Sequence, residues 1–201
     1  TNLSAALPGT TGGAQPTNSA PAISNEEAFI ARLAADLTVI NQATYYGSFG
    51  TEDVSNSLAI HPTTGEVYVA GQTNLSAALP GTTGGAQPAS GGSQDMFVVR
   101  FGAALTTLGQ ATYLGGAVSE ERVQSIAIHP GTGDVYVTGI SYSNDFPITP
   151  GGAQQTFAGG LSDAFVAWLS ADLGTLNQAT YLGGARDDAG RRHFVAIHAV
   201  R

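Results

Sequence analysis

Cysteine is absent from this chain of 201 residues, and only 11% of its residues are charged. The lack of cysteine excludes disulfides, thiolate metal sites and a cysteine nucleophile. The charged fraction is about half of the roughly 25% that is usual in soluble domains. Gly, Thr, Ser, Ala, Asn and Gln take the place of the missing charge. We therefore expect a polar but uncharged surface, a composition that favours an extracellular setting.

Positive charge is especially scarce, because the chain has no lysine and a formal net charge of −8. Nucleic-acid binding needs a basic patch that neutralises phosphates. The one close group of arginines, Arg186, Arg191 and Arg192, flanks Asp187 and Asp188. Long apolar runs are also missing, so we expect neither a transmembrane segment nor a signal peptide. The sequence thus predicts no nucleic-acid partner and no membrane span.

Internal repetition is what the sequence has in abundance. The stretch TNLSAALPGTTGGAQP at residues 1–16 returns unchanged at residues 73–88. The segment NQATYYGS begins at residue 41 and returns as GQATYLGG at 109 and NQATYLGG at 177, 68 residues apart in both steps. The repetition divides the chain into a half unit, two whole units and the start of another, over residues 1–49, 50–116, 117–184 and 185–201.

Each whole unit is expected to fold as four short antiparallel strands. In the last whole unit these strands are expected at about residues 124–129, 134–138, 163–169 and 177–182. Apolar residues recur with a period of two, which predicts strands and no helix. Pro130 and Gly133 suit a short hairpin turn between the first two strands. The strands are apolar on both faces, which predicts small sheets covered on both sides, as in propeller blades or a stacked array.

The repeated pieces VYVTG, DAFVAWL and TYLGG, together with NDFPITPGGA, resemble the β-propeller repeat (SBBP repeat) family of bacterial secreted and surface proteins. This resemblance extends over nearly the whole chain. It implies a blade fold and an extracellular or cell-surface location, and it brings no shared catalytic residues. The chain departs from the family pattern at His61, His129 and His198, where the family usually has Asp. The DFPxTPGA pattern is present at residues 145–153 and is replaced in the other two copies.

The expected fold class is all-β, with tandem four-stranded antiparallel blades of the β-propeller type in an open array of about three blades. A propeller ring usually needs about four to eight blades, so this chain cannot close a ring alone. Unpaired strand edges recruit partners, and a head-to-tail contact that does not close generates a filament. We therefore expect self-association, or contact with further blades of a longer chain, at both ends. The expected interface residues are Thr1, Asn2, Leu3, Trp168, Phe194, Val195 and Ile197.

Trp168 is a candidate interface anchor because it takes the position of Arg32 and Arg100 in the other copies. An exposed tryptophan suits a contact surface. The alternative is that it covers apolar surface where the terminal blade lacks a neighbour.

Histidines recur at matching positions, His61, His129 and His198. In a closed propeller they could ring the axis and bind a metal ion. The simpler interpretation, which we favour, is that each histidine caps a strand just before a turn. No metal site or cofactor is therefore predicted.

Carboxylates recur in two places in each unit. Acidic pairs precede each first strand, and a single acid begins each third strand; they are Glu52–Asp53, Glu120–Glu121 and Asp187–Asp188, and Glu27, Asp95 and Asp163. The pairs could hold Ca²⁺ or act as acid and base, but adjacent side chains point apart. Solvated loops are the simpler interpretation for the pairs, and accepting backbone N–H bonds is the expected role of the single acids.

The function favoured by these features is that of a non-enzymatic extracellular structural or interaction protein, assembled with further copies or further chain into a ring or filament. An alternative is a glycan- or protein-binding module that uses the long loops, in which the aromatic residues are Tyr142, Phe146 and Phe157. A lyase or hydrolase with a propeller funnel is a further alternative that rests on fold analogy. The sequence contains no nucleophile elbow, phosphate loop or zinc-protease motif.

Overall fold

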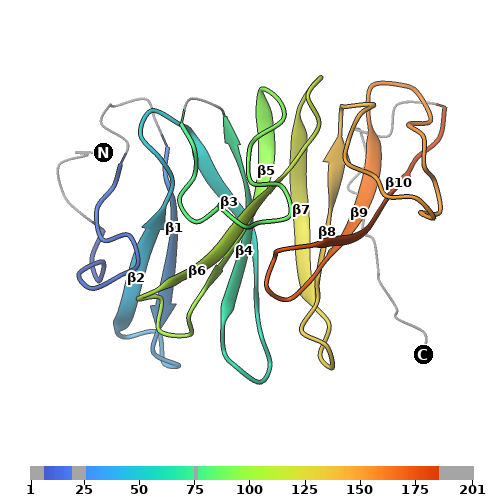
Figure 1. The fold of residues 1–201 in the computed structure, drawn as a ribbon. Helices are drawn as coiled ribbons and strands as arrows, with labels where there is room; N and C mark the ends of the chain where they lie inside the picture. The colour runs from blue at the N-terminus through green and yellow to red at the C-terminus, as the bar shows by residue number, and fades with distance from the viewer. Residues whose placement is uncertain (1–6, 20–25, 75–76, 186–201) are drawn as a thin grey trace.

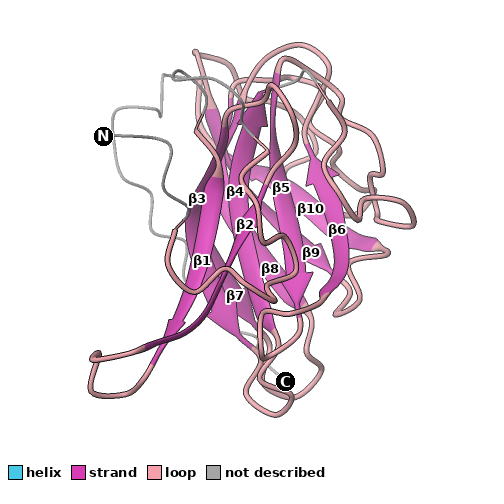
Figure 2. Ribbon diagram, turned by 90° about the vertical axis from the view of Figure 1, so that its left-hand side faces the viewer, coloured by secondary structure: helices cyan, strands magenta, loops and turns pink. Residues whose placement is uncertain are grey.

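The computed structural model describes residues 7–19, 26–74 and 77–185, and these residues form ten β-strands and no helix (Figures 1 and 2). The strands are β1 (Ala28–Leu33), β2 (Ile40–Tyr46), β3 (Asp53–Ile60), β4 (Val67–Asn74), β5 (Gln94–Phe101), β6 (Leu108–Leu114), β7 (Glu121–Ile128), β8 (Val135–Ser141), β9 (Asp163–Leu169) and β10 (Leu176–Leu182). The fold is therefore all-β, as the sequence predicts. No helix in the described part of the chain is long and apolar enough to cross a membrane.

The strands form three antiparallel sheets, in which neighbours in sequence are neighbours in space. Sheet I pairs β1 with β2, sheet II has the order β3-β4-β5-β6, and sheet III has the order β7-β8-β9-β10. Figure 1 shows the three sheets following one another across the molecule from the blue to the red end. Two four-stranded units are thus present, and the described strands do not close into a ring.

The two inner strands of the second sheet, β4 and β5, are buried on both faces, which explains why they are mostly apolar. One core cluster joins Ala28, Ile30 and Tyr46 of sheet I to Phe97 and Phe101 of sheet II. A second cluster lies between sheets II and III and contains Tyr68, Ala70, Met96, Val98, Leu114, Ile126, Phe165 and Leu169. We call the face of a sheet that packs on the following sheet its forward face, and the opposite face its rear face.

The turn between the third and fourth strand of each unit carries a leucine with left-handed backbone. Leu37, Leu105 and Leu173 have φ angles of 60°, 60° and 62°, a region that non-glycine residues seldom occupy. Leu105 and Leu173 are buried in the clusters on the rear faces of their own sheets. Their carbonyl oxygens accept 2.9 Å hydrogen bonds from the backbone N–H of Ala14 and Ala86, which belong to the preceding units. These turns therefore join each sheet to the sheet before it.

The first hairpin of the last whole unit is longer than the sequence predicts. The prediction began the first strand of the last unit at residue 124 and ended the second at residue 138, whereas β7 begins at Glu121 and β8 ends at Ser141. Gly139, which was expected to begin a loop, pairs with both Val123 and Phe165 inside the sheet. The ring of Phe165 lies over Gly139, where a Cβ atom would collide with it. This glycine serves close packing and does not end the strand.

Candidate interaction surface

The acid that begins each third strand holds the loop in front of it. Asp95 accepts hydrogen bonds from the backbone N–H groups of Gly91 and Gly92 at 2.6 and 3.2 Å and from Ser90 Oγ at 2.6 Å. Asp163 accepts one from the Ala158 N–H at 2.6 Å. The predicted role of these carboxylates as acceptors of backbone N–H bonds is confirmed.

The acidic pairs differ from the solvated loops that the sequence predicts. Asp53 and Glu121 are the first residues of β3 and β7, and both are buried, whereas Glu52 is exposed. The expectation that adjacent side chains point apart is correct, but the interpretation of both members as solvated is wrong. Strand alternation sends the second member of each pair inward. Asp187 and Asp188 lie outside the described residues.

Glu121 lies in a polar pocket formed by β8 of its own sheet and by the segment that follows β6 of sheet II. Its carboxylate accepts hydrogen bonds from Ser141 Oγ at 2.9 Å and from the Gly116 N–H at 3.2 Å. Burial raises the pKa of Glu121 to about 7, and the negative charge of nearby Asp95 adds to this rise. Burial also raises the pKa of Asp53, although hydrogen bonds from Thr51 and Ser48 oppose it.

Two acids meet at each joint between sheets. Asp95 and Glu121 both lie against Gly115, and Glu27 and Asp53 both lie against Gly47. Within the described residues, however, no three acidic or histidine side chains gather in a way that could hold a metal ion. The chemistry that the joints display is hydrogen bonding to loop amides and hydroxyls.

His61 and His129 have the capping geometry that the simpler interpretation predicts. Nδ1 of His61 lies 3.2 Å from the backbone nitrogens of both Thr63 and Thr64, and Nδ1 of His129 lies 3.1 Å from the nitrogen of Thr132. An imidazole nitrogen that accepts these bonds organises the hairpin turn. His198, the third of the recurring histidines, lies outside the described residues.

Trp168 lies on the forward face of sheet III and is partly buried. Its ring stacks on Tyr136 of the neighbouring strand, with centroids 6.0 Å apart and planes 12° from parallel. The equivalent Arg100 of sheet II lies at a joint, where it pairs with Glu66 at 3.6 Å. Trp168 thus occupies a position that is used for contact between sheets in the preceding unit. The other predicted interface residues, Thr1, Asn2, Leu3, Phe194, Val195 and Ile197, lie outside the described residues.

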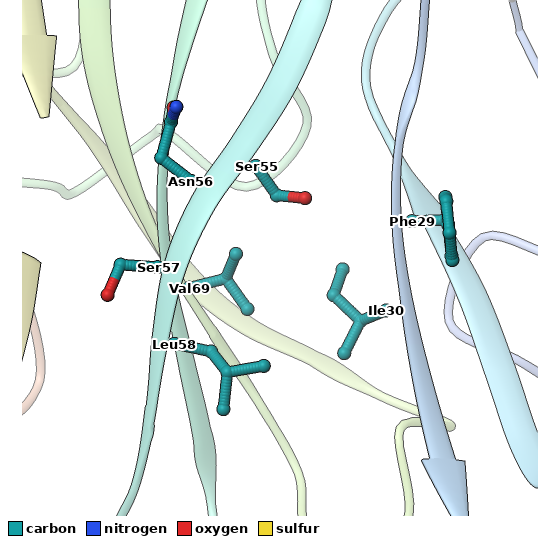
Figure 3. Close-up of a pocket in the computed structure, with 7 residues that line it drawn as sticks. All are labelled: Phe29, Ile30, Ser55, Asn56, Ser57, Leu58 and Val69. Atoms are coloured by element: carbon teal, nitrogen blue, oxygen red, sulfur yellow. The ribbon is translucent and has the colours of Figure 1, made fainter. Parts of the chain in front are cut away.

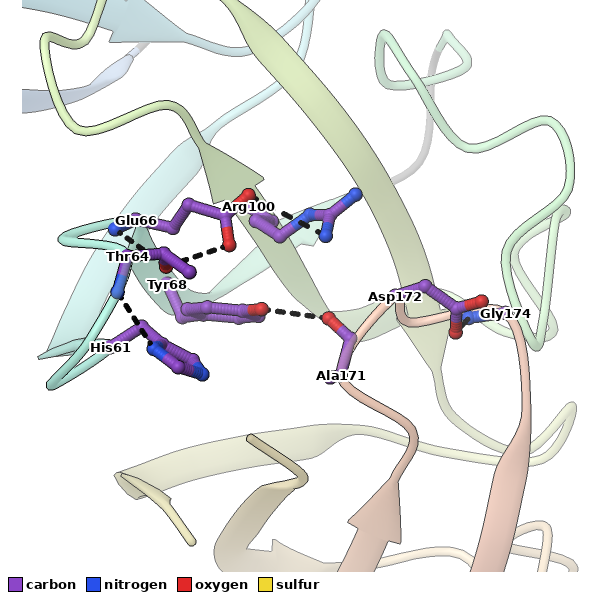
Figure 4. Close-up of polar contacts among 8 residues, drawn as sticks. All are labelled: His61, Thr64, Glu66, Tyr68, Arg100, Ala171, Asp172 and Gly174. Carbon is purple, nitrogen blue, oxygen red and sulfur yellow. Dashed lines mark hydrogen bonds and ion pairs between the residues drawn. The ribbon is translucent and has the colours of Figure 1, made fainter. Parts of the chain in front are cut away.

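Polar contacts also cross the joint between sheets II and III (Figure 4). The Tyr68 hydroxyl donates a 2.7 Å hydrogen bond to the carbonyl oxygen of Ala171. Arg100 lies close enough to Asp172 to contribute to the lowered pKa of that carboxyl, which is caused mainly by hydrogen bonds from Ser170 and Gly174. The joint therefore combines an apolar centre with directional contacts at its edge.

The rear face of sheet I leaves apolar residues exposed at positions whose equivalents in sheets II and III are buried. Phe29 is 53% exposed, whereas the equivalent Phe97 and Phe165 are fully buried. Leu37 is 74% exposed, whereas Leu105 is 1% exposed. The exposed apolar residues of this surface are Phe29, Leu33, Leu37 and Ile40. Sequence reasoning missed them, although their equivalence to core positions, 68 residues on, was a signal that could have found them.

Comparisons with known proteins assign no function to this surface. The resemblance to the β-propeller repeat family stays a prediction, because the chain matches no protein-family model and no curated protein.

Proposed function

We propose that this chain is a non-enzymatic structural protein of the extracellular space or cell surface, in which stacked blade-like sheets build a scaffold that continues into further copies or further chain. The observation that carries the proposal is the contrast between Phe29 and its buried equivalents Phe97 and Phe165. The rear faces of sheets II and III are each covered by the preceding sheet, whereas the rear face of sheet I is exposed. The low charge and the Thr-, Gly- and Ser-rich composition support the location.

The energetic argument rests on the apolar area that the rear face of sheet I leaves in water. Burying a Phe or Leu side chain contributes roughly 1.5–3 kcal/mol. Phe29, Leu33 and Leu37 each have an equivalent that obtains this contribution at an internal joint. Contiguous exposed apolar patches of this kind mark interaction sites in soluble proteins. Association through this face is the function that the geometry supports best.

The direct test is sedimentation velocity of the 20.4 kDa chain from micromolar to millimolar concentration. We expect the mean mass to rise with concentration, and Leu33→Asp to weaken the association at least tenfold. The matched control is Val118→Asp, because Val118 is also exposed but lies in the loop between β6 and β7. A monomer at every concentration would overturn assembly through copies of this chain.

A further inference from the structure

A groove runs between the outer edge of β1 and the rear face of sheet II (Figure 3). Its walls are Phe29 and Ile30 of β1, residues 55–58 of β3, and Val69 of β4. In Figure 3 the side chains of Ile30, Leu58 and Val69 point into the space between the strands. The lining is therefore apolar along these three side chains, and the hydroxyl of Ser55 also points into the space.

The corresponding place at the next joint is filled by a strand. There β7 packs on β3, β4 and β5 of sheet II, and Tyr68 and Ala70 of β4 share a core cluster with Ile126 of β7. Ile126 is 7% exposed, whereas its equivalent Leu58 is 55% exposed. The difference arises because no described strand of sheet I takes the place that β4 has in sheet II. The groove between sheets I and II therefore has the form that the joint between sheets II and III would have without β4.

The edge of β1 offers the hydrogen-bonding groups that such a strand needs. In sheets II and III the third strand pairs on both sides, β5 with β4 and β6, and β9 with β8 and β10. Within the described residues, β1 pairs with β2 alone. An open edge with an apolar groove beside it suits β-strand addition.

The register of the two complete sheets specifies which strand fits. Gly71 pairs with Phe97, and Gly139 pairs with Phe165. A Cβ atom at Gly71 would overlap both the Phe97 ring and the carbonyl oxygen of Val54. A strand that pairs with β1 in the same register places its glycine opposite Phe29. With the Phe29 ring placed as the Phe97 ring is, the same collision would disfavour every residue other than glycine at that position.

We propose that the groove binds the first hairpin of a further repeat unit, whose second strand has the pattern Val-Tyr-Val-small-Gly and pairs antiparallel with β1. Its glycine lies opposite Phe29 and its tyrosine opposite Arg32, as Tyr68 lies opposite Arg100 in sheet II. Its tyrosine and small residue cover Leu58, as Tyr68 and Ala70 cover Ile126. The bound hairpin completes a four-stranded sheet I. This inference deepens the proposed stacking function and rests on it.

The experiment uses the 201-residue chain and a fluorescent peptide with the sequence of residues 53–74, which form the β3–β4 hairpin. Fluorescence anisotropy should show saturable binding. Gly71→Val in the peptide should weaken binding at least tenfold, whereas Thr63→Ala in its turn should leave it unchanged. In the protein, Leu58→Asp should weaken binding at least tenfold, because Leu58 forms the groove floor, and Val118→Asp should have no effect.

The outcomes separate this inference from the proposed function. No binding, or equal binding of the wild-type and Gly71→Val peptides, overturns the inference. Self-association of the chain without peptide binding shows that a second copy covers the surface, which leaves the proposed function standing and overturns the hairpin as occupant. Specific binding of the peptide to a chain that stays monomeric supports the hairpin as the occupant of the groove. It also rules out assembly through copies of this chain.

Discussion

At Glu121 the sheet places a carboxyl group where water cannot reach it, next to the carboxylate of Asp95. The group is held by the hydroxyl of Ser141 and the backbone N–H of Gly116, and neither donor carries a positive charge. Its protonation therefore depends on pH within the neutral range, and the stability of the joint between sheets II and III depends on it in turn.

We expect Glu121 to make folding less favourable as the pH rises. Its pKa is about 7 in the folded chain and near 4.3 in an unfolded one, so the folded state binds more protons between these values. The free energy of unfolding therefore falls as the pH rises through this window, by about 1.4 kcal/mol for each unit of pKa difference. Glu121→Gln should flatten the profile and stabilise the chain at pH 8.

Urea unfolding between pH 4.5 and pH 8 measures this effect. Glu120→Gln is the matched control, because Glu120 is its partly exposed neighbour and bonds to Arg122 at 3.0 Å. If Glu121→Gln retained the wild-type slope, the buried carboxyl would not be the source of the pH dependence.

At the scale of elements, the turn between the third and fourth strands shows that one local conformation has two different consequences. The left-handed φ angle is the same at Leu37 and Leu105, but Leu37 is exposed and Leu105 is buried. The left-handed region costs a non-glycine residue about 1–2 kcal/mol. The buried leucine offsets this cost by packing in the core, and the exposed one has no such compensation within the described residues.

We expect Leu37→Gly to stabilise the isolated chain by about 1 kcal/mol, because glycine adopts this φ angle without strain. Leu105→Gly should destabilise it by about 2–4 kcal/mol, because the lost core packing outweighs the relief of strain. Thermal or urea unfolding of the two variants at a concentration where the chain is monomeric gives both values. The same sign for both variants would contradict this account.

Individual strands also show how much of the fold can be predicted from the sequence. The strand at residues 163–169 was predicted with its observed bounds, because a short run of apolar residues follows Asp163 without interruption. The hairpin before it was predicted too short, because Gly139 is indistinguishable in sequence from a loop glycine until the ring of Phe165 is placed over it. The apolar residues on both faces predicted covered sheets, but which face of sheet I stays uncovered depends on tertiary neighbours that a local pattern does not contain.

At the scale of the whole molecule, the three sheets are unequal in how much of their surface is covered. Sheet II is packed on both faces, with fully buried residues such as Phe97 and Val98 on adjacent positions of β5. Sheet I has two described strands and is packed on its forward face. Local stability follows the density of buried contacts, so it should fall from the central sheet toward the first.

Native-state hydrogen exchange tests this gradient. We expect the amides of β4 and β5 to exchange most slowly and those on the outer edge of β1 to exchange at least tenfold faster. Adding the residue 53–74 peptide should slow exchange along β1 while leaving β5 unchanged. Uniform protection across the three sheets would show that the molecule opens as a single cooperative unit.

The pairing of strands that follow one another in sequence has a consequence for how the chain acquires its structure. Every strand pair within sheets II and III joins neighbours along the chain, so each sheet can form before distant segments meet. Topologies with such local pairing close short loops and fold quickly for β proteins. A completed sheet then presents an ordered apolar surface on which the next sheet can pack. Folding can therefore propagate from one sheet to the next, with each folded sheet acting as the template for its neighbour.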